Sequence, residues 1–427
     1  MSETGRRLLV VSYNHPPCPG IAGTRWQAMA RYLREQGHSV TILASDAWGA
    51  LPDDAASDVI RVGDLRAARA LRWAFRRGEL RADGYEGLER PPTALLTKVL
   101  VPEMNVATWL PALTVTARRL LARRQFNCLV TTSPPESSHL LGLLLSRHRP
   151  AWIADFRDGW AYEPYREPFP TAVQRSLDLS LERWVCQSAE VAAAATRPIA
   201  EDLVGRLGVP AEWVTNGWVP AAETHETSSS LPPTSSGTRT LVYTGTLSGE
   251  WGRDPEPLLR ALAAVQKEAD PARLRLVHAG RLRPAEQEAI ERAGVADSVE
   301  HLGTLDRTQS LALQRSADAV VLITSRHASE ATGKLFEYLA SGRPILALAD
   351  GNEAARIVTE TNTGITVPPD DVDAIAAALR RVAAGELERA YAPRNLEQYT
   401  YPGPAERMAE LIEEAIQRRT QRGNARR

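Results

Sequence analysis

The chain has 427 residues, a formal net charge of −1, 43% hydrophobic residues and 24% charged residues. This length predicts two domains, and the near-neutral charge argues against bulk binding of nucleic acid. No run of about 18 apolar residues is present, so the sequence predicts no membrane-spanning helix.

Neither the cysteines nor the N-terminal residues indicate secretion. The three cysteines are widely spaced, which fits neither a disulfide framework nor a zinc site. Polar residues at the start of the chain lead directly into an apolar segment, without the apolar core of a signal peptide. We therefore expect a cytoplasmic protein.

The first segments predict a strand, a helix and a second strand. Strands are expected over Leu8–Tyr13 and Ser39–Ala44, and a helix over Thr24–Gln36 with Thr24 as its N-cap. The loop before this helix contains Gly20 and Gly23, at the carboxyl end of a strand, where α/β folds bind ligands. Its spacing is not G-x-G-x-x-G, which argues against NAD. The two glycines either contact a ligand or simply shape the turn.

An arginine-rich stretch follows, between Arg61 and Arg90. It holds eight arginines against five acidic residues, with large apolar residues between them. Three interpretations remain open: the stretch receives a substrate, lies on an anionic membrane surface, or is a solvated helix face.

Two carboxylates and a guanidinium gather at the end of the predicted strand Trp152–Phe156. Asp155 and Arg157 are expected either to act on a ligand or to pair with each other and shape the loop. In the second case, Asp158 is the residue expected to form hydrogen bonds with the hydroxyl groups of a ligand. His139, in the helix predicted over Glu136–Ser146, is interpreted as structural.

Residues 219–239 are rich in Ser, Thr, Pro and Glu and predict a linker. We therefore expect one domain over residues 1–218, a second over 240–400 and a C-terminal segment over 401–427. A helix over Pro404–Arg418 is expected to cross back onto the first domain. The tail from Arg418 to Arg427 holds five arginines and no acidic residue, and is expected to be disordered.

The second domain alternates six strands with six helices, which predicts a parallel, doubly wound sheet. The strands are expected at Leu241–Thr246, Leu274–Gly280, Val299–Gly303, Ala319–Thr324, Ile345–Leu348 and Gly364–Val367. The helices are expected at Pro255–Lys267, Pro284–Ala293, Arg307–Ser316, Thr332–Ala340, Glu353–Glu360 and Val372–Ala383.

The segment Ser325–Leu348, SRHASEATGKLFEYLASGRPILAL, predicts an anion site. A strand, a loop with Thr332 and Gly333, and a helix start present free N–H groups and a helix dipole that favour phosphate. Lys334 adds a compact charge at this helix start, in a chain where only three of 51 basic residues are lysines. Glu337, one turn into the helix, is placed to accept hydrogen bonds from a ribose diol. A diphosphate beside a sugar diol describes a nucleotide-sugar.

This segment resembles the donor motif of GT-B glycosyltransferases of family 4, in the branch that reads roughly K-L-F-E-Y-L-A-x-G-x-P. Many members carry two glutamates separated by seven residues. Here Glu337 is the second, Ser329 holds the first position, and Glu330 follows one residue later. Many members also have a histidine where we align Arg157.

The stretch Thr244–Arg253 departs from the same family. Relatives commonly place an arginine and a lysine on the donor phosphates at the positions of Thr246 and Trp251. Arg253, Arg281 and Lys334 are the cations that remain to supply this charge.

The resemblance implies an α/β protein of the GT-B fold, with two Rossmann-like, doubly wound domains facing a central cleft. It also implies a set of site residues. The expected catalytic residues are Lys334, Arg253, Asp158 and Arg157. The expected donor-binding residues are Gly23, Gly245, Thr246, Arg281, Leu305, Thr332, Gly333, Lys334 and Glu337. The expected acceptor or sugar contacts are Gly20, Asp155, Asp158 and Glu330.

The family retains anomeric configuration, so the resemblance implies a retaining transferase without a protein nucleophile. No Asp-x-Asp metal motif stands in a suitable loop, and we expect metal-independent transfer in which Lys334 and Arg253 stabilise the diphosphate. The expected donor is a UDP-sugar in the first place, and a dTDP-sugar or GDP-sugar in the second. The expected acceptor is a glycan intermediate or a small secondary metabolite.

Two other functions remain open from the sequence. One is a sugar-nucleotide epimerase, an activity that also occurs on the GT-B fold. The other is a non-catalytic protein that binds nucleotide-sugar or supports a partner enzyme, which the missing family residues favour. The expected partners are otherwise small molecules, with no nucleic acid and at most peripheral membrane contact.

Overall fold

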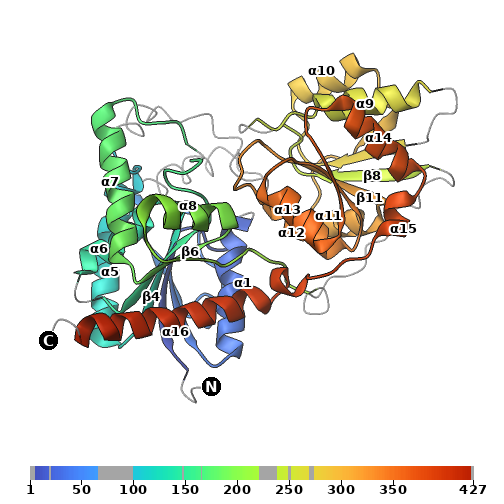
Figure 1. Ribbon diagram of the computed structural model, residues 1–427. Coiled ribbons are helices and arrows are strands. Elements are labelled where there is room, and N and C mark those ends of the chain that lie inside the picture. The colour runs from blue at the N-terminus through green and yellow to red at the C-terminus, as the bar shows by residue number, and fades with distance from the viewer. Residues whose placement is uncertain are drawn as a thin grey trace. The chain divides into compact units, whose positions relative to one another are not determined.

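The computed structural model describes residues 5–18, 21–65, 100–146, 149–164, 166–220, 238–248, 252–268 and 274–424. The chain forms two compact units (Figure 1): unit 1 contains Met1–Asn216 and Tyr401–Arg427, and unit 2 contains Gly217–Thr400. The chain therefore leaves unit 1 once and returns to it once. Gly20, most of the arginine-rich stretch (residues 66–90) and most of the predicted linker (residues 221–237) lie outside the described residues.

Unit 1 contains a seven-stranded sheet in the order β3-β2-β1-β4-β5-β6-β7, and every pairing in it is parallel. The order reverses between β1 and β4, as in a doubly wound fold. The strands are β1 (Arg7–Ser12), β2 (Ser39–Ser45), β3 (Val59–Val62), β4 (Cys128–Ser133), β5 (Ala151–Phe156), β6 (Val191–Ala194) and β7 (Ala211–Trp213).

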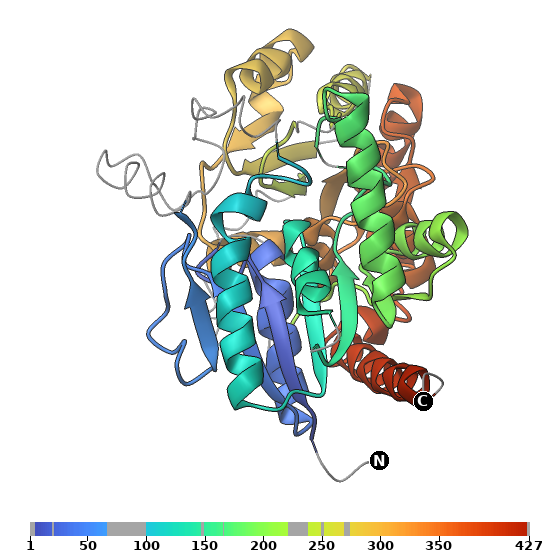
Figure 2. The same cartoon turned by 90° about the vertical axis from the view of Figure 1, so that its left-hand side faces the viewer.

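Helices cover both faces of this sheet. Helices α5 (Leu110–Arg123), α6 (Ser137–Leu145), α7 (Ala172–Ser188) and α8 (Arg197–Leu207) lie side by side over one face and share one apolar core with its strands (Figure 2). Helices α1 (Ile21–Glu35) and α16 (Gly403–Asn424) pack against each other and against β2 and β5. The short helix α4 (Asn105–Thr108) precedes α5. Because helices cover both faces, every residue of β4, β5 and β6 is buried.

Two expectations about helix ends in unit 1 are wrong. Helix α1 begins at Ile21, so Thr24 lies inside its first turn and is not the N-cap. Helix α16 continues to Asn424, so the arginine-rich segment that we expected to be disordered is helical up to that residue. An ion pair one turn apart, between Arg418 and Glu414 at 2.6 Å, helps to extend the helix.

Unit 2 contains a six-stranded sheet in the order β10-β9-β8-β11-β12-β13, again with every pairing parallel. The prediction of a doubly wound sheet is confirmed, and all six predicted strands are present. They are β8 (Arg239–Thr244), β9 (Leu274–Ala279), β10 (Val299–His301), β11 (Ala319–Ile323), β12 (Ile345–Leu348) and β13 (Gly364–Val367). The order reverses between β8 and β11, which is where such sheets bind ligands.

The six predicted helices of unit 2 are confirmed to within about one residue at each end. They are α9 (Glu256–Gln266), α10 (Pro284–Ala293), α11 (Arg307–Ser316), α12 (Gly333–Ser341), α13 (Glu353–Thr361) and α14 (Val372–Ala383). The short helix α15 (Glu386–Ala390) and the 3₁₀ turns η4 (Ala296–Ser298) and η5 (Glu397–Tyr399) complete the unit.

The two ends of unit 2 lie side by side. Trp218 and Thr400 form an isolated parallel β-bridge, and the N–H of Trp218 donates to the carbonyl of Tyr399 at 3.0 Å.

Throughout the described part of the chain, no helix combines the length and apolarity needed to cross a bilayer. The three cysteines are buried and unpaired with one another.

Candidate functional site

The start of α12 presents backbone N–H groups without a side-chain cap. Thr332 is the N-cap residue, with extended backbone (φ −67°, ψ 159°), but its hydroxyl makes no cap hydrogen bond in the described structure. By contrast, Asp306, Asn352 and Asp371 accept from the N–H three residues later and cap α11, α13 and α14. The first turn of α12 therefore lacks a cap from the Thr332 side chain, and a helix N-terminus of this kind favours an anion. At the other end of α12, Gly342 has φ 69° and ends the helix as predicted.

The Lys334 side chain reaches from α12 across the loop that follows β8. Its Nζ lies 3.1 Å from the hydroxyl oxygen of Tyr243, 3.3 Å from the carbonyl oxygen of Thr246 and 4.6 Å from the centre of the Tyr243 ring. The Tyr243 hydroxyl in turn donates to the same carbonyl at 2.7 Å. The charge is thus held at the carboxyl end of β8, next to the strand-order reversal.

Two glycines allow this close approach. A Cβ on Gly245, which has φ +92°, would lie 2.6 Å from Cε of Lys334. A Cβ on Gly280, which follows β9, would lie 2.4 Å from the carbonyl oxygen of Gly245. His278 contacts that same carbonyl oxygen through Nε2 at 2.7 Å. The predicted residues Gly245 and Thr246 therefore belong to a tightly packed loop around Lys334.

Arg253 and Glu330 form an ion pair between the loop after β8 and the loop after β11. The guanidinium donates to one oxygen of Glu330 at 3.0 and 2.7 Å, and the other oxygen accepts from the N–H of Ser325. The Glu330 side chain is only 1% exposed and that of Arg253 is 18% exposed. Glu330, expected at the donor sugar, is therefore directed to Arg253, while part of the guanidinium remains accessible.

The other predicted donor residues lie at the same edge of the sheet. Glu337 is partly exposed and lies 3.4 Å from the guanidinium of Arg307 on α11. Arg281 is exposed directly after Gly280, and Leu305 is partly buried directly before the N-cap of α11. All three follow the carboxyl ends of parallel strands or begin the helices after them.

In unit 1, Asp155 pairs with Arg25 and not with Arg157. Its carboxylate accepts from Arg25 at 2.9 Å and from the indole N–H of Trp26 at 2.8 Å, and the pair is almost fully buried. Burial alone raises the pKa of Asp155, but the Arg25 charge and these hydrogen bonds outweigh it and lower the pKa. The expected internal pair with Arg157 is therefore wrong, since α1 supplies the partner.

Arg157 instead forms hydrogen bonds with backbone carbonyl groups. Its guanidinium donates to the carbonyls of Ser133 at 2.8 Å, Pro134 at 2.6 Å and Ala22 at 2.6 Å. Burial lowers its pKa from the usual value, although Asp158 and Asp155 partly oppose this. Arg157 thus ties the loop after β4 to the start of α1.

Gly23 lies in that first turn of α1. A Cβ there would lie 2.5 Å from the carbonyl oxygen of Cys18, so the position requires glycine for packing.

Three carboxyl groups near the ends of β4 and β5 have raised pKa values. They belong to Asp158, Glu103 and Glu136, and burial is the main cause for each. The Glu136 charge raises the pKa of Glu103 further, while the Arg157 charge moderates that of Asp158. Asp158 is half-buried, and Glu103 accepts a hydrogen bond from the N–H of Ser137 at 3.0 Å. Asp158 can therefore offer a carboxyl group to a ligand at this edge.

Comparison with known proteins identifies the class of protein to which the chain belongs. Residues 238–384 match the family model for glycosyl transferases group 1, and residues 22–216 match that for the glycosyl transferase 4-like domain. The protein is a glycosyltransferase. One match spans β2–β7 of the first sheet and the other spans all six strands of the second, so the matches extend over both units. No curated protein sequence matches the chain.

Solved structures share the GT-B fold with this glycosyltransferase. A sucrose-phosphate synthase from Thermosynechococcus elongatus aligns with a TM-score of 0.60 at 17% identity, covering 96% of this chain and 98% of that one. A glycosyltransferase from Rickettsia africae aligns with a TM-score of 0.62 at 13% identity, covering 97% and 99%. A UDP-GlcNAc 2-epimerase from Methanocaldococcus jannaschii aligns with a TM-score of 0.54 at 13% identity, covering 95% and 99%.

Sequence reasoning missed three residues that shape the loop around Lys334. Tyr243 contacts Lys334 and His278 contacts Gly245, and each lies near the carboxyl end of its strand. Glu286, only 2% exposed, accepts from the N–H of Ser248 at 2.7 Å and from the N–H of Arg283 at 2.7 Å. The capping-box spacing from Arg283 to Glu286 was the available signal.

Sequence reasoning also missed Glu103 and Glu136 in unit 1. Across the described ranges, no group of three or more His, Cys, Asp or Glu side chains is arranged to hold a metal ion.

Proposed function

We propose that this glycosyltransferase moves a sugar, with retention of configuration, from a nucleoside-diphosphate sugar to a hydroxyl group. The acceptor is a glycan intermediate or a small secondary metabolite. The observation that carries the proposal is Lys334, fixed by Tyr243 and Thr246 beside the uncapped start of α12. A fixed cation at a helix N-terminus matches a leaving diphosphate. In this proposal unit 2 binds the donor and unit 1 the acceptor.

Two cations meet the diphosphate in the proposed complex. Lys334 contributes from α12, and Arg253 contributes the accessible part of its guanidinium. Glu330 then acts through Arg253, because its buried carboxylate fixes the orientation of that guanidinium. With both cations in place, no metal ion is required for charge neutralisation.

The nucleoside lies along the strand ends next to α12. Glu337 accepts hydrogen bonds from the ribose diol and exchanges its long contact with Arg307 for them. Leu305 packs against the base, and Arg281 lies on the side of the diphosphate.

The transfer step needs no protein nucleophile. The bond between the anomeric carbon and the diphosphate oxygen breaks, and the acceptor oxygen bonds to the same face of that carbon. The acceptor proton passes to the leaving phosphate oxygen, so atoms and charge balance. Lys334 and Arg253 stabilise the developing negative charge, and Asp158 accepts hydrogen bonds from sugar hydroxyl groups.

UDP is the first nucleotide to test. The family resemblance favours it, and the epimerase that shares this fold is named for a UDP-linked sugar. That likeness also favours a second candidate function, epimerisation of a nucleotide-sugar. Turnover of the donor sugar to its epimer without any acceptor would identify it.

The experiment is thermal unfolding with UDP, dTDP, GDP, ADP and NAD, each with and without EDTA. A ligand at 100 times its Kd stabilises by about 2.7 kcal/mol. We expect one nucleoside diphosphate to stabilise the protein equally in EDTA, and Lys334→Ala to lose the effect. Lys267→Ala, at an exposed lysine ending α9 of the same unit, is the matched control and should keep it. No shift with any nucleoside diphosphate would contradict the donor site.

A further inference from the structure

Large exposed apolar side chains gather on one helical layer of unit 1. Eight are exposed among the described residues, and all eight belong to unit 1. Seven of them lie on α5–α8, the layer that covers one face of the sheet: Val115, Leu144, Val173, Leu177, Leu179, Trp184 and Val204. Such a concentration on one face marks an interaction surface.

Helix α7 carries the most continuous part of this surface. Val173, Leu177 and Trp184 are spaced by four and seven residues, which places them along one side of the helix. Val173 is 78% exposed and Trp184 is 59% exposed. The stripe therefore runs nearly the length of α7, which lies between α6 and α8.

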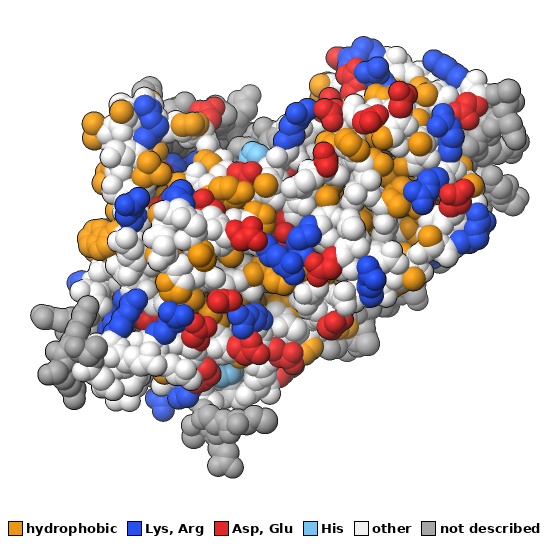
Figure 3. Space-filling view, in the orientation of Figure 1, with side chains coloured by type: hydrophobic (Ala, Val, Ile, Leu, Met, Phe, Trp, Pro, Cys, Tyr) orange, Lys and Arg blue, Asp and Glu red, His pale blue; other side chains and the backbone are white. Residues whose placement is uncertain are grey.

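The α5–α7 part of this face is cationic, whereas α8 carries the exposed Glu201. Five arginines are exposed on α5 and α7, whereas the only acidic residues of α5–α7, Asp178 and Glu182, are buried. Arg166 and Arg206 pair with these two carboxylates. The exposed arginines are Arg118, Arg119, Arg123, Arg175 and Arg183. Hydrophobic and basic side chains gather along the left-hand edge of Figure 3, over α7. This bias contrasts with a net charge of −1 for the whole chain.

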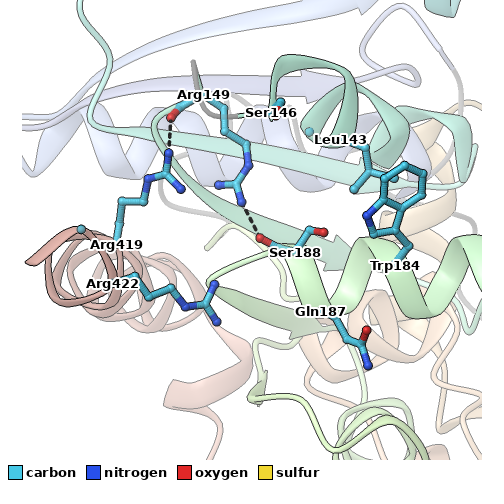
Figure 4. Close-up of a pocket in the computed structure, with 10 residues that line it drawn as sticks. Leu143, Ser146, Arg149, Trp184, Gln187, Ser188, Arg419 and Arg422 are labelled. Atoms are coloured by element: carbon cyan, nitrogen blue, oxygen red, sulfur yellow. Dashed lines mark hydrogen bonds between the residues drawn. The ribbon is translucent and has the colours of Figure 1, made fainter. Parts of the chain in front are cut away.

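A cavity of about 490 Å³ lies at the C-terminal end of the apolar stripe. Figure 4 shows Trp184 and Gln187 of α7 on one side of it and three arginines on the other. Arg149 precedes β5, while Arg419 and Arg422 come from α16. The indole of Trp184 thus joins the cavity to the exposed stripe.

The three arginines share one carboxylate. Glu190 is fully buried and lies 2.8 Å from Arg149, and its other oxygen lies 3.6 Å from both Arg419 and Arg422. Arg149 also donates to the carbonyl of Ser188 at the end of α7. In the described part of the chain, three guanidinium groups thus converge on one carboxylate beside the cavity, and such a cluster favours an anion with several oxygens, such as a phosphate ester.

We propose that the α5–α7 face docks on a bilayer containing anionic phospholipids. Trp184 and the stripe on α7 enter the interface, and the arginine cavity receives a phosphate head group. The charge argues against a second copy as the occupant, because two such faces would oppose arginine to arginine. This proposal does not depend on the donor or the acceptor.

The test is co-sedimentation of the full chain with vesicles of phosphatidylcholine alone and with about one-third phosphatidylglycerol. We expect binding only to the anionic vesicles, decreasing with added salt. Removal of Arg118 and Arg183 together should weaken binding about fivefold for each arginine. Arg422→Ala should weaken it by a similar factor, and Trp184→Ser should also weaken it.

The matched control removes two exposed arginines of unit 2, Arg292 and Arg380, and should leave binding unchanged. Equal binding to both vesicle types would overturn the proposal, as would variants of the α5–α7 face that bind like the wild type. If inorganic phosphate stabilises the protein but the protein binds no vesicles, the cavity is a site for a free anion. That result would overturn the proposal of bilayer docking. A changed elution volume for Trp184→Ser in gel filtration, without a loss of vesicle binding, would assign the face to a protein contact and also overturn it.

Discussion

The Nζ atom of Lys334 lies 3.1 Å from the hydroxyl oxygen of Tyr243, and both groups lie within hydrogen-bond distance of the carbonyl of Thr246. The tyrosine therefore fixes the position of the charge without neutralising it. A cation that is already in place loses little freedom when a diphosphate arrives, which is the condition for strong electrostatic stabilisation in a transition state.

Lys334→Ala should lower kcat/KM by about 10²- to 10³-fold, as expected for the loss of one fixed group that stabilises developing charge. The fold should remain, because Tyr243 keeps its bond to Thr246. Steady-state kinetics and circular dichroism check both statements, with Lys267→Ala as the control. A near-normal kcat/KM would remove Lys334 from the reaction.

Glu337→Ala should weaken nucleotide binding by about 1.5–3 kcal/mol, the range for hydrogen bonds that involve a charged group. Its side chain makes an exposed 3.4 Å contact with Arg307, so the loss should reflect the ribose and not the fold. Titration calorimetry measures the effect. Glu288→Ala, at an exposed glutamate of α10, is the control, and an unchanged affinity for Glu337→Ala would place the ribose elsewhere.

Glu330→Gln should destabilise unit 2 by about 1.5–3 kcal/mol, because Arg253 loses its buried charged partner. It should also weaken donor binding, because the guanidinium is no longer oriented. Calorimetric unfolding provides the first measurement. The control is Glu268→Gln, which breaks an exposed pair with Arg380 and should cost no more than about 1 kcal/mol. Equal effects of the two changes would contradict the positioning role.

His139 should make unit 1 sensitive to acid. Burial lowers its pKa from 6.5 to about 3, although Asp155 partly opposes this, so the folded protein keeps it neutral while the unfolded chain takes up a proton. The contribution of neutral His139 to the free energy of unfolding is fully present above pH 6.5. It is lost as pH falls from 6.5 toward 3. The slope approaches about 1.4 kcal/mol per pH unit.

The variant His139→Gln removes this titration and should flatten the slope by that amount. Unfolding followed by tryptophan fluorescence is suitable, because eight of the ten tryptophans belong to unit 1. His301→Gln, at an exposed histidine of unit 2, is the control. An unchanged slope for His139→Gln would mean that another group is responsible.

The regular alternation of unit 2 was predictable because each helix there begins and ends with a local signal. Pro284 opens α10, Asp306 caps α11 and Gly342 ends α12. In unit 1 such signals are weaker. Strand β3 has only four residues at the sheet edge, and α7 carries exposed leucines that blur its helical period. Neither element was expected.

The candidate site was predictable only where the residues that form it are close together in the sequence. Thr332, Gly333 and Lys334 are adjacent, so their geometry follows from one helix start. Arg253 and Glu330 are 77 residues apart, and Arg25 and Asp155 are 130 apart, so their pairing depends on the strand order. That is why the sequence suggested only the nearby Arg157 as a possible partner for Asp155. The roles of these residues at a bound donor or acceptor, and the cytoplasmic location, stay predictions.

The adjacent ends of unit 2 make it exchangeable. The chain leaves unit 1 after Asn216, whose side chain accepts a hydrogen bond from Arg25 at 3.0 Å, and returns at Tyr401, whose hydroxyl donates to the carbonyl of the same arginine at 3.3 Å. Just beyond these anchors, Trp218 and Thr400 are bridged. A foreign unit spliced between Asn216 and Tyr401 would meet two attachment points held by one residue of α1. Under the proposed assignment of the donor to unit 2 and the acceptor to unit 1, chimaeras joined at these points would combine one acceptor specificity with many donor sugars.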